Sequence, residues 1–219
     1  WKSILVADRG EIAIRIIRSA KELGIRTVAV YEEADRLSRH INSADEAVCI
    51  GPGPGRDYRD GDRIIQAALS TDVEAIHPGY GPLSEDPSFI QACQNSGIAF
   101  IGPSPAASYN ATDRLICRQI MQHAGVPVIT GTDALPPDRR GERDALRFAE
   151  SQGYPVFLKK AAGGDARSLI AHSSEEIISG LDTLRAESEP TGKPPRIYLE
   201  QAIPECRHIE VQLLADRRG

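Results

Sequence analysis

The sequence predicts an α/β protein, in which a doubly wound parallel sheet is followed by an incomplete α+β domain. Up to about residue 110, short runs that are apolar throughout alternate with helical patterns. Such runs are typical of parallel strands that are buried on both faces of a sheet. After about residue 110 this alternation stops, and two apolar runs are joined by a loop of small residues instead. We therefore expect one domain over residues 1–110 and the start of another over 111–219.

Five strands are predicted in the first region. The first, over 3–7, precedes a helix in which apolar residues recur near a period of about 3.6, and Gly24 follows as a helix end signal. The remaining strands are expected over 26–31, 46–51, 74–79 and 98–103, with helices near 64–69 and 87–96.

The second region has a different pattern. Helices are expected over about 104–110, 112–124, 141–152 and 174–186, and strands over 155–160, 168–172 and 196–201. The first two of these strands read as an antiparallel pair. His208 and Glu210 alternate on a further predicted strand that reaches a turn near Gly219, so we expect the chain to stop in the middle of a fold.

Composition excludes several function classes. The 219 residues carry a net charge of −5 without a dense Lys/Arg face, so no nucleic-acid partner is expected. No apolar run approaches the roughly 18 residues of a membrane helix, so no membrane partner is expected either. The 4 cysteines are far apart and form no CxxC pair, which is typical of reduced thiols in an intracellular protein rather than a zinc site.

Two glycine-containing segments follow predicted strands of the first region. "ILVADRGEIAIRI" has the strand–turn–helix order of a dinucleotide-binding fold but only one glycine, so we interpret it as a tight turn. "HPGYGPLSED" places His77 at a strand end, where open α/β sheets bind ligands. A hydrogen-bonded structural histidine is the commoner outcome at such a position.

The loop "KKAAGGDARS" over 159–168 has two readings. Lys159 can meet phosphate oxygens as a point charge, and Gly163 and Gly164 would let backbone N–H groups face an anion. Asp165 would repel a triphosphate unless Mg²⁺ or Arg167 intervenes. The alternative is a hairpin turn, for which Gly-Gly-Asp is equally suitable.

Taken in order, seven segments resemble the N-terminal portion of biotin carboxylase, the ATP-grasp component of biotin-dependent carboxylases such as acetyl-CoA, propionyl-CoA, pyruvate or urea carboxylase. They are "ADRGEIAIRIIRSAKELGIRTVAVY", "ADEAVCIGPGP", "AIHPGYGPLSED", "GIAFIGPS", "AGVPV", "GYPVFLKKAAGG" and "RHIEVQLLAD". They cover nearly all of the chain in the order of the family. The combination is specific, although no single segment would decide it.

This resemblance implies a Rossmann-like pre-ATP-grasp domain over 1–110, then an ATP-grasp domain whose flap subdomain spans about 131–203. It implies an ATP-dependent ligase that uses Mg-ATP and bicarbonate to form carboxyphosphate and to carboxylate biotin on a carrier. The expected partners are a biotin carboxyl carrier domain, a carboxyltransferase domain and a second copy that contacts Arg15 and Arg18. The expected location is the cytoplasm, or the mitochondrial matrix if a leader was removed.

The resemblance also assigns site residues. Lys159 matches a phosphate-binding lysine, Glu200 a carboxylate that accepts from the adenine amino group, and His208 a histidine near the ribose. The remaining nucleotide-site positions are Arg114, where the family usually has lysine, the flap residues Gly163, Gly164 and Asp165, and the adenine-reading linker Gln201, Ala202 and Ile203. The magnesium ligands and catalytic residues are expected beyond Gly219.

Two departures from the family pattern leave alternatives open. Arg114 replaces a compact ammonium by a planar fork, and the flap has fewer glycines than the family, with Asp165 among them. One alternative is therefore a homologue without catalytic activity that acts as a scaffold or regulator. Another is an ATP-grasp ligase of different specificity, such as a carbamoyl-phosphate-type enzyme.

Overall fold

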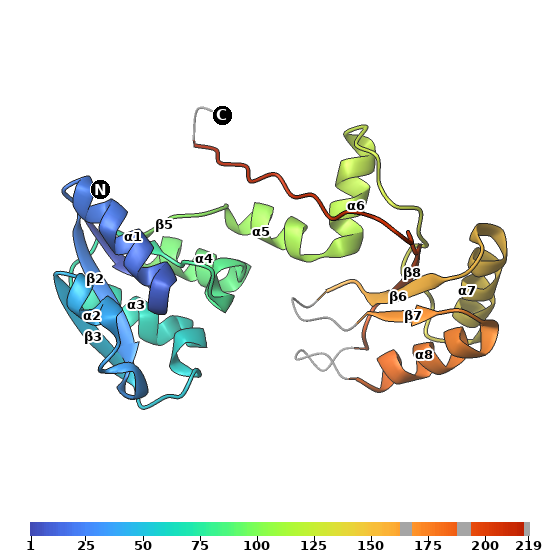
Figure 1. Ribbon diagram of the computed structural model, residues 1–219, viewed down its shortest axis with the longest axis horizontal. Helices are drawn as coiled ribbons and strands as arrows, with labels where there is room; N and C mark the ends of the chain where they lie inside the picture. Colours follow the sequence, from blue (N-terminus) through green and yellow to red (C-terminus); the bar gives the residue numbers. More distant parts are fainter. Residues whose placement is uncertain (163–167, 188–193, 217–219) are drawn as a thin grey trace. The chain divides into compact units, whose positions relative to one another are not determined.

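The computed structural model describes residues 1–162, 168–187 and 194–216. The chain divides into two compact units, Trp1–Thr112 and Asp113–Gly219, which we describe separately (Figure 1). Gly163, Gly164 and Asp165 of the predicted flap lie outside the described residues.

The first unit is built on a parallel sheet with the strand order β3-β2-β1-β4-β5 (Figure 1). Its strands are β1 (Ser3–Val6), β2 (Arg26–Glu32), β3 (Glu46–Gly51), β4 (Ala75–His77) and β5 (Ala99–Phe100). Each neighbouring pair is parallel. The chain proceeds from β1 towards one edge and then returns to β4 on the other side of β1. The predicted doubly wound parallel sheet is confirmed.

Both faces of this sheet are buried, because successive strand residues enter different cores. Leu5 packs in one core with residues of α3 (Gly61–Ser70) and α4 (Pro87–Asn95). Ile4 and Val6 pack in another core with α1 (Gly10–Glu22). The helices α2 (Arg39–Ser43) and α5 (Pro105–Thr112) and the short 3-10 helices Glu33–Asp35, Asp57–Arg59 and Pro82–Ser84 complete the unit.

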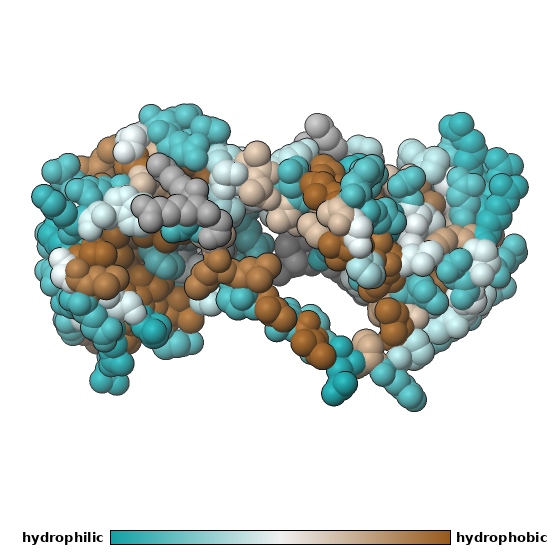
Figure 2. All heavy atoms as spheres, turned by 90° about the horizontal axis from the view of Figure 1, so that it is seen from above, coloured by the Kyte–Doolittle hydropathy of each residue, from teal (hydrophilic) through white to brown (hydrophobic). Residues whose placement is uncertain are grey.

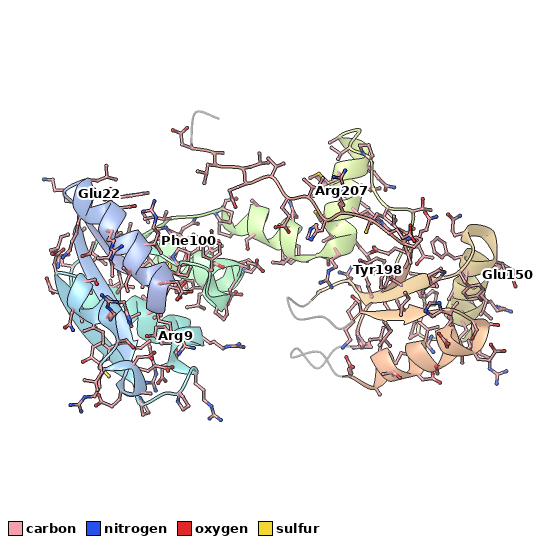
Figure 3. All side chains as sticks on the ribbon, viewed as in Figure 1. Arg9, Glu22, Phe100, Glu150, Tyr198 and Arg207 are labelled. Atoms are coloured by element: carbon pink, nitrogen blue, oxygen red, sulfur yellow. The ribbon has the colours of Figure 1, made fainter. Side chains whose placement is uncertain are left out.

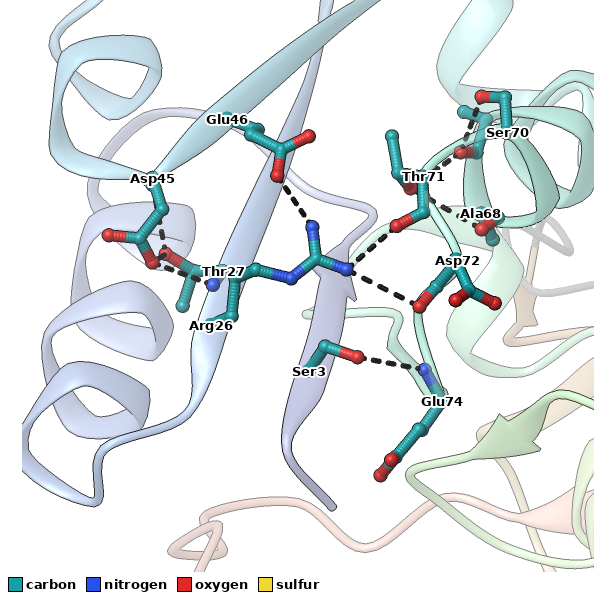
Figure 4. A network of polar contacts seen from close by, with 11 residues as sticks. Ser3, Arg26, Thr27, Asp45, Glu46, Ala68, Ser70, Thr71, Asp72 and Glu74 are labelled. Atoms are coloured by element: carbon teal, nitrogen blue, oxygen red, sulfur yellow. Dashed lines mark hydrogen bonds and ion pairs between the residues drawn. The ribbon is translucent and has the colours of Figure 1, made fainter.

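A polar network lies at the amino-terminal ends of the parallel strands (Figure 4). The Arg26 guanidinium donates to the Glu46 carboxylate at 2.6 Å and to the Thr71 carbonyl at 2.7 Å. Asp45 accepts from both the backbone N–H and the hydroxyl of Thr27 at 2.8 Å. The network ties β2 to the segment before β4 and so fixes the amino-terminal ends of these strands.

The second unit contains an antiparallel sheet with the order β7-β6-β8, formed by β6 (Val156–Lys160), β7 (Leu169–Ala171) and β8 (Ile197–Gln201). The helices α7 (Arg139–Gln152) and α8 (Ser174–Ala186) pack on one face through a core that includes Val156, Leu158 and Leu199. The remaining helix, α6 (Arg114–His123), contacts the other face through Leu115 and Tyr198.

The strand predicted around His208 and Glu210 does not form. Residues 202–216 have no regular secondary structure, and Ile209, Val211, Leu213 and Leu214 are exposed. Figure 2 shows hydrophobic residues projecting along this extended segment. A strand needs a neighbour for its backbone N–H and C=O groups, and within the described ranges this segment has none.

Candidate functional site

The candidate site lies on the face of the small sheet that α6 contacts. Phe157 pairs with Glu200 and Lys159 with Tyr198 in the β6–β8 register. Because side chains alternate along a strand, these four residues share one face, while Val156 and Leu158 enter the core beneath α7 and α8. Figure 3 shows Tyr198 on the side of the sheet towards α6.

Lys159 and Glu200 form an ion pair on this face through Nζ and Oε1. The Glu200 side chain is 10% exposed and that of Lys159 is 24% exposed. The Lys159 ammonium also lies 5.2 Å from the centre of the Phe157 ring, within cation–π range. The structure therefore brings together two residues that lie 41 positions apart in the sequence and that the resemblance assigns to different parts of a nucleotide.

Two interactions fix the start of α6 beside this pair. Asp113 caps the helix by accepting from Leu115 N at 3.0 Å and Ile116 N at 3.1 Å. Its second oxygen pairs with Arg196, the residue before β8. The cap and the ion pair together hold the first turn of α6 against the edge strand.

Arg114 is anchored to the end of β6. Its backbone N–H donates to the Ala161 carbonyl at 2.8 Å, and its Nη1 donates to the Lys160 carbonyl at 3.1 Å. The guanidinium carries further N–H donors besides the one used in this contact. The guanidinium therefore lies at the base of the loop that contains the predicted flap.

Tyr198 lies between opposite charges. Burial, followed by the negative charge of Glu200, raises the pKa of its hydroxyl to about 12, and the positive charges of Arg114 and Arg118 oppose this increase. At neutral pH the hydroxyl is therefore protonated. Around the neutral Tyr198 hydroxyl, the described residues thus include the carboxylate of Glu200 and the cationic groups of Lys159, Arg114 and Arg118, an arrangement suited to an anionic ligand.

The other residues predicted for the nucleotide site do not all lie near the Lys159–Glu200 pair. Gln201 ends β8, Ala202 is buried, and Ile203 is exposed. His208 is not brought to the Lys159–Glu200 pair: its exposed ring pairs with Glu210 at 3.2 Å in the extended segment. Its predicted place near a ribose remains a prediction.

Sequence reasoning missed Phe157, Tyr198 and Arg118. The signal available was the period-2 alternation of the two strands, which places Phe157 with Lys159 and Tyr198 with Glu200. Arg118 could be found as the residue one helical turn after Arg114.

His77 occupies the carboxyl edge of the parallel sheet in the first unit. Its Nδ1 accepts from Gly79 N at 3.1 Å, while Asp8 accepts from Tyr80 N at 2.7 Å. Burial lowers the pKa of His77, and the negative charge of Asp8 partly opposes this effect. These contacts make His77 a turn-stabilising residue, the structural alternative considered from the sequence.

No helix in the described part of the chain is long and apolar enough to cross a membrane. In the same residues, no group of three or more His, Cys, Asp or Glu side chains is arranged to hold a metal ion.

Comparison with known families gives two adjacent matches. Residues 1–108 match "Biotin carboxylase, N-terminal domain", and residues 113–219 match "Carbamoyl-phosphate synthase L chain, ATP binding domain".

Individual proteins are similar over the whole chain. The chain is 40% identical to biotin carboxylase 1 of Bacillus subtilis over 220 residues, covering 100% of this chain and 48% of that protein. It is 41% identical to the 2-oxoglutarate carboxylase small subunit of Hydrogenobacter thermophilus, covering 100% of this chain and 46% of that protein. The chain thus spans about half the length of these relatives.

Solved structures agree with these matches. The biotin carboxylase domain dimer of the Hydrogenobacter thermophilus 2-oxoglutarate carboxylase, in complex with MgADP, ADP and bicarbonate, has a TM-score of 0.84 and 41% identity, covering 93% of this chain and 44% of that one. A biotin carboxylase–β,γ-ATP complex from Campylobacter jejuni also has a TM-score of 0.84, with 38% identity, covering 92% of this chain and 45% of that one. The predicted resemblance is confirmed: over the region that it spans, the chain belongs to the biotin carboxylase family.

Proposed function

We propose that this chain forms part of a biotin carboxylase, and that the face carrying Lys159, Tyr198 and Glu200 binds Mg-ATP. In the whole protein, ATP and bicarbonate would yield carboxyphosphate, and the carboxyl group would pass to biotin on a carrier. The observation that carries the proposal is the Lys159–Glu200 pair beside the Arg114 and Arg118 guanidiniums.

Each side chain offers one part of a nucleotide a partner. The Glu200 carboxylate can accept from the exocyclic amino group of adenine, and the backbone after β8, over 201–203, offers further polar groups to the purine edge. The Lys159 ammonium and the Arg114 guanidinium offer positive charge to the phosphates. These contacts would act mainly by positioning the nucleotide and neutralising the charge of its phosphates, as in phosphoryl transfer generally.

Mg²⁺ would accompany the triphosphate, where it would neutralise phosphate charge. The described residues contain no cluster that fits a metal, so we assign none of them to this ion. Support for the ligands comes from similar structures, one solved with MgADP, ADP and bicarbonate and another as a β,γ-ATP complex.

The partners we propose are a biotin carboxyl carrier domain, a carboxyltransferase domain and a second copy of the chain. A relative named as the small subunit of 2-oxoglutarate carboxylase supports the multicomponent organisation. Arg15 and Arg18 are exposed on α1, and a similar domain was solved as a dimer, which supports a homodimer through this helix. For location we propose the cytoplasm, or the mitochondrial matrix, since one relative is the alpha subunit of the mitochondrial methylcrotonoyl-CoA carboxylase of Glycine max.

A homologue that does not bind nucleotide is the second candidate. Two residues favour it: Asp165 stands in the loop that carries the predicted flap, and the Arg114 Nη1 is already engaged by the Lys160 carbonyl. Nucleotide binding distinguishes the two candidates.

The test is calorimetric titration of Mg-ATP into the wild type, Lys159→Met and the control Lys2→Met, whose exposed side chain lies in the first unit. We expect wild type and Lys2→Met to bind equally. Lys159→Met should lose about tenfold or more in affinity, or about 1.4 kcal/mol, for one charge-assisted contact. If the wild type produces no binding heat and no displacement of a fluorescent ATP analogue, the proposal is wrong and the scaffold candidate holds.

A further inference from the structure

The backbone of Glu200 is held from both sides. On one side it pairs with Phe157 of β6. On the other, residues 130–135 run along the outer edge of β8: Gln201 N donates to Thr130 O at 2.9 Å, and Thr132 N donates to Leu199 O at 2.8 Å. Gly131 forms the bridge directly opposite Glu200. The position of Glu200 therefore depends on the position of the 130–132 segment.

Arg118 joins this segment to the site. Its Nη2 donates to the Thr132 carbonyl, and its Cζ lies 5.5 Å from the centre of the Tyr198 ring. Its Nη1 is buried and has no hydrogen-bond partner in the described part of the chain. The Arg118 guanidinium thus contacts both the 130–132 segment, which lies opposite Glu200, and Tyr198, which precedes Glu200 by two positions.

Gly131 leaves the space that the guanidinium fills. A Cβ built at Gly131 would lie 2.7 Å from the Leu199 carbonyl oxygen and 3.2 Å from the Glu200 Cβ, and it would collide with Arg118 Nη1. The Arg118 side chain, Gly131 and Glu200 are therefore closely packed, with no room for a side chain at position 131.

We propose that Arg118 is the positioning residue for Glu200, and that it sets how strongly the site prefers adenine over guanine nucleotides. This inference rests on the function proposed above. A carboxylate accepts from the 6-amino group of adenine, whereas guanine presents a carbonyl oxygen there, so two acceptors would face each other. A hydrogen bond weakens steeply with misalignment, and a site built around one rejects analogues that cannot make it. Loss of the Arg118 contact should therefore let the 130–132 segment move and reduce the discrimination between adenine and guanine.

The claim that Arg118 holds the 130–132 segment against β8 can be tested without a nucleotide, by amide hydrogen exchange of the chain. We compare wild type, Arg118→Ala, Arg118→Lys and the control Arg143→Ala, which removes an exposed side chain of α7. In Arg118→Ala the amides of Thr132 and Gln201 should exchange about tenfold faster through local opening, whereas amides in the β6–β7 pair should not change. Arg118→Lys, which retains charge but not the fork, should lie between these values. Unchanged exchange at Thr132 and Gln201 would overturn the inference and leave the proposed function intact.

The functional part is the ratio of affinities for Mg-ADP and Mg-GDP in the same four proteins. Wild type and Arg143→Ala should prefer ADP equally, Arg118→Ala should lower the ratio about tenfold, and Arg118→Lys should restore part of it. If Arg118 had only a structural role, its loss would lower the affinities for Mg-ADP and Mg-GDP by the same factor. An unchanged ratio of the two affinities would therefore overturn the inference. If the wild type binds neither nucleotide, the proposed function is wrong and the link to base preference is wrong with it.

Discussion

Lys159 and Glu200 are diagonal neighbours on the β6–β8 pair, and their side chains meet as an ion pair on the face contacted by α6. Diagonal neighbours on one face are within reach of long side chains. Each charge is the partner of the other. An adenine nucleotide would offer Glu200 an amino group and Lys159 a phosphate.

Removing one member of this pair should destabilise the second unit more than removing both. Lys159→Met leaves a carboxylate whose side chain is only 10% exposed without its cation, and an uncompensated charge of this kind is costly. We expect Lys159→Met to lower the free energy of unfolding by about 2 kcal/mol, and Lys159→Met with Glu200→Gln to lower it by less. Urea denaturation of these two variants and of the single Glu200→Gln variant completes the double-mutant cycle, and strictly additive effects would show that the two groups do not interact.

Gly79 should tolerate alanine less well than Gly97. Both have a positive φ, +64° and +74°, but a Cβ at Gly79 would collide with the Asp8 carboxylate, while one at Gly97 meets nothing within 4 Å. We expect Gly97→Ala to cost about 1 kcal/mol of unfolding free energy from the backbone alone, and Gly79→Ala to cost about 2–3 kcal/mol. Thermal denaturation of the two variants decides this, and equal losses would refute a specific contact at Asp8.

Stability should fall as pH drops below the ordinary pKa of histidine, in part because of His77. Burial lowers the pKa of His77 from 6.5, so the unfolded chain takes up a proton at a higher pH than the folded chain. The contribution is fully present above about pH 6.5 and is lost as pH falls through the lower folded value. Between about pH 7 and 5 the loss of unfolding free energy should be smaller in His77→Gln than in the wild type. Equal pH slopes would exclude His77 as the cause.

The fold was predictable where local pattern and tertiary structure agree. The strand predicted over 3–7 is apolar from Ile4 to Ala7, and the structure buries Ile4 and Leu5 in different cores. The helix predicted over 174–186 has the same bounds as α8, because Ser173 supplies a cap by accepting from Glu176 N at 3.3 Å. Such signals are contained in a few neighbouring residues.

The rest depends on partners distant in the sequence. A strand around His208 was predicted from alternation alone, but alternation supplies no neighbouring strand. The resemblance assigned nucleotide roles to Lys159 and Glu200, but their proximity follows from the β6–β8 register, which places Phe157 opposite Glu200. Arg118 was missed because its importance comes from contacts with Thr132 and Tyr198 rather than from its neighbours on α6.

The location of nucleotide binding tests the central claim most directly. Mg-ADP should be titrated into the isotope-labelled chain while backbone amide shifts are followed by NMR. We predict the largest shift changes in 157–161 and 198–203, at the ends of β6 and β8, with little change around His77 and Tyr80. Changes centred on the carboxyl edge of the parallel sheet, or no changes at saturating nucleotide, would contradict a nucleotide site at Lys159 and Glu200.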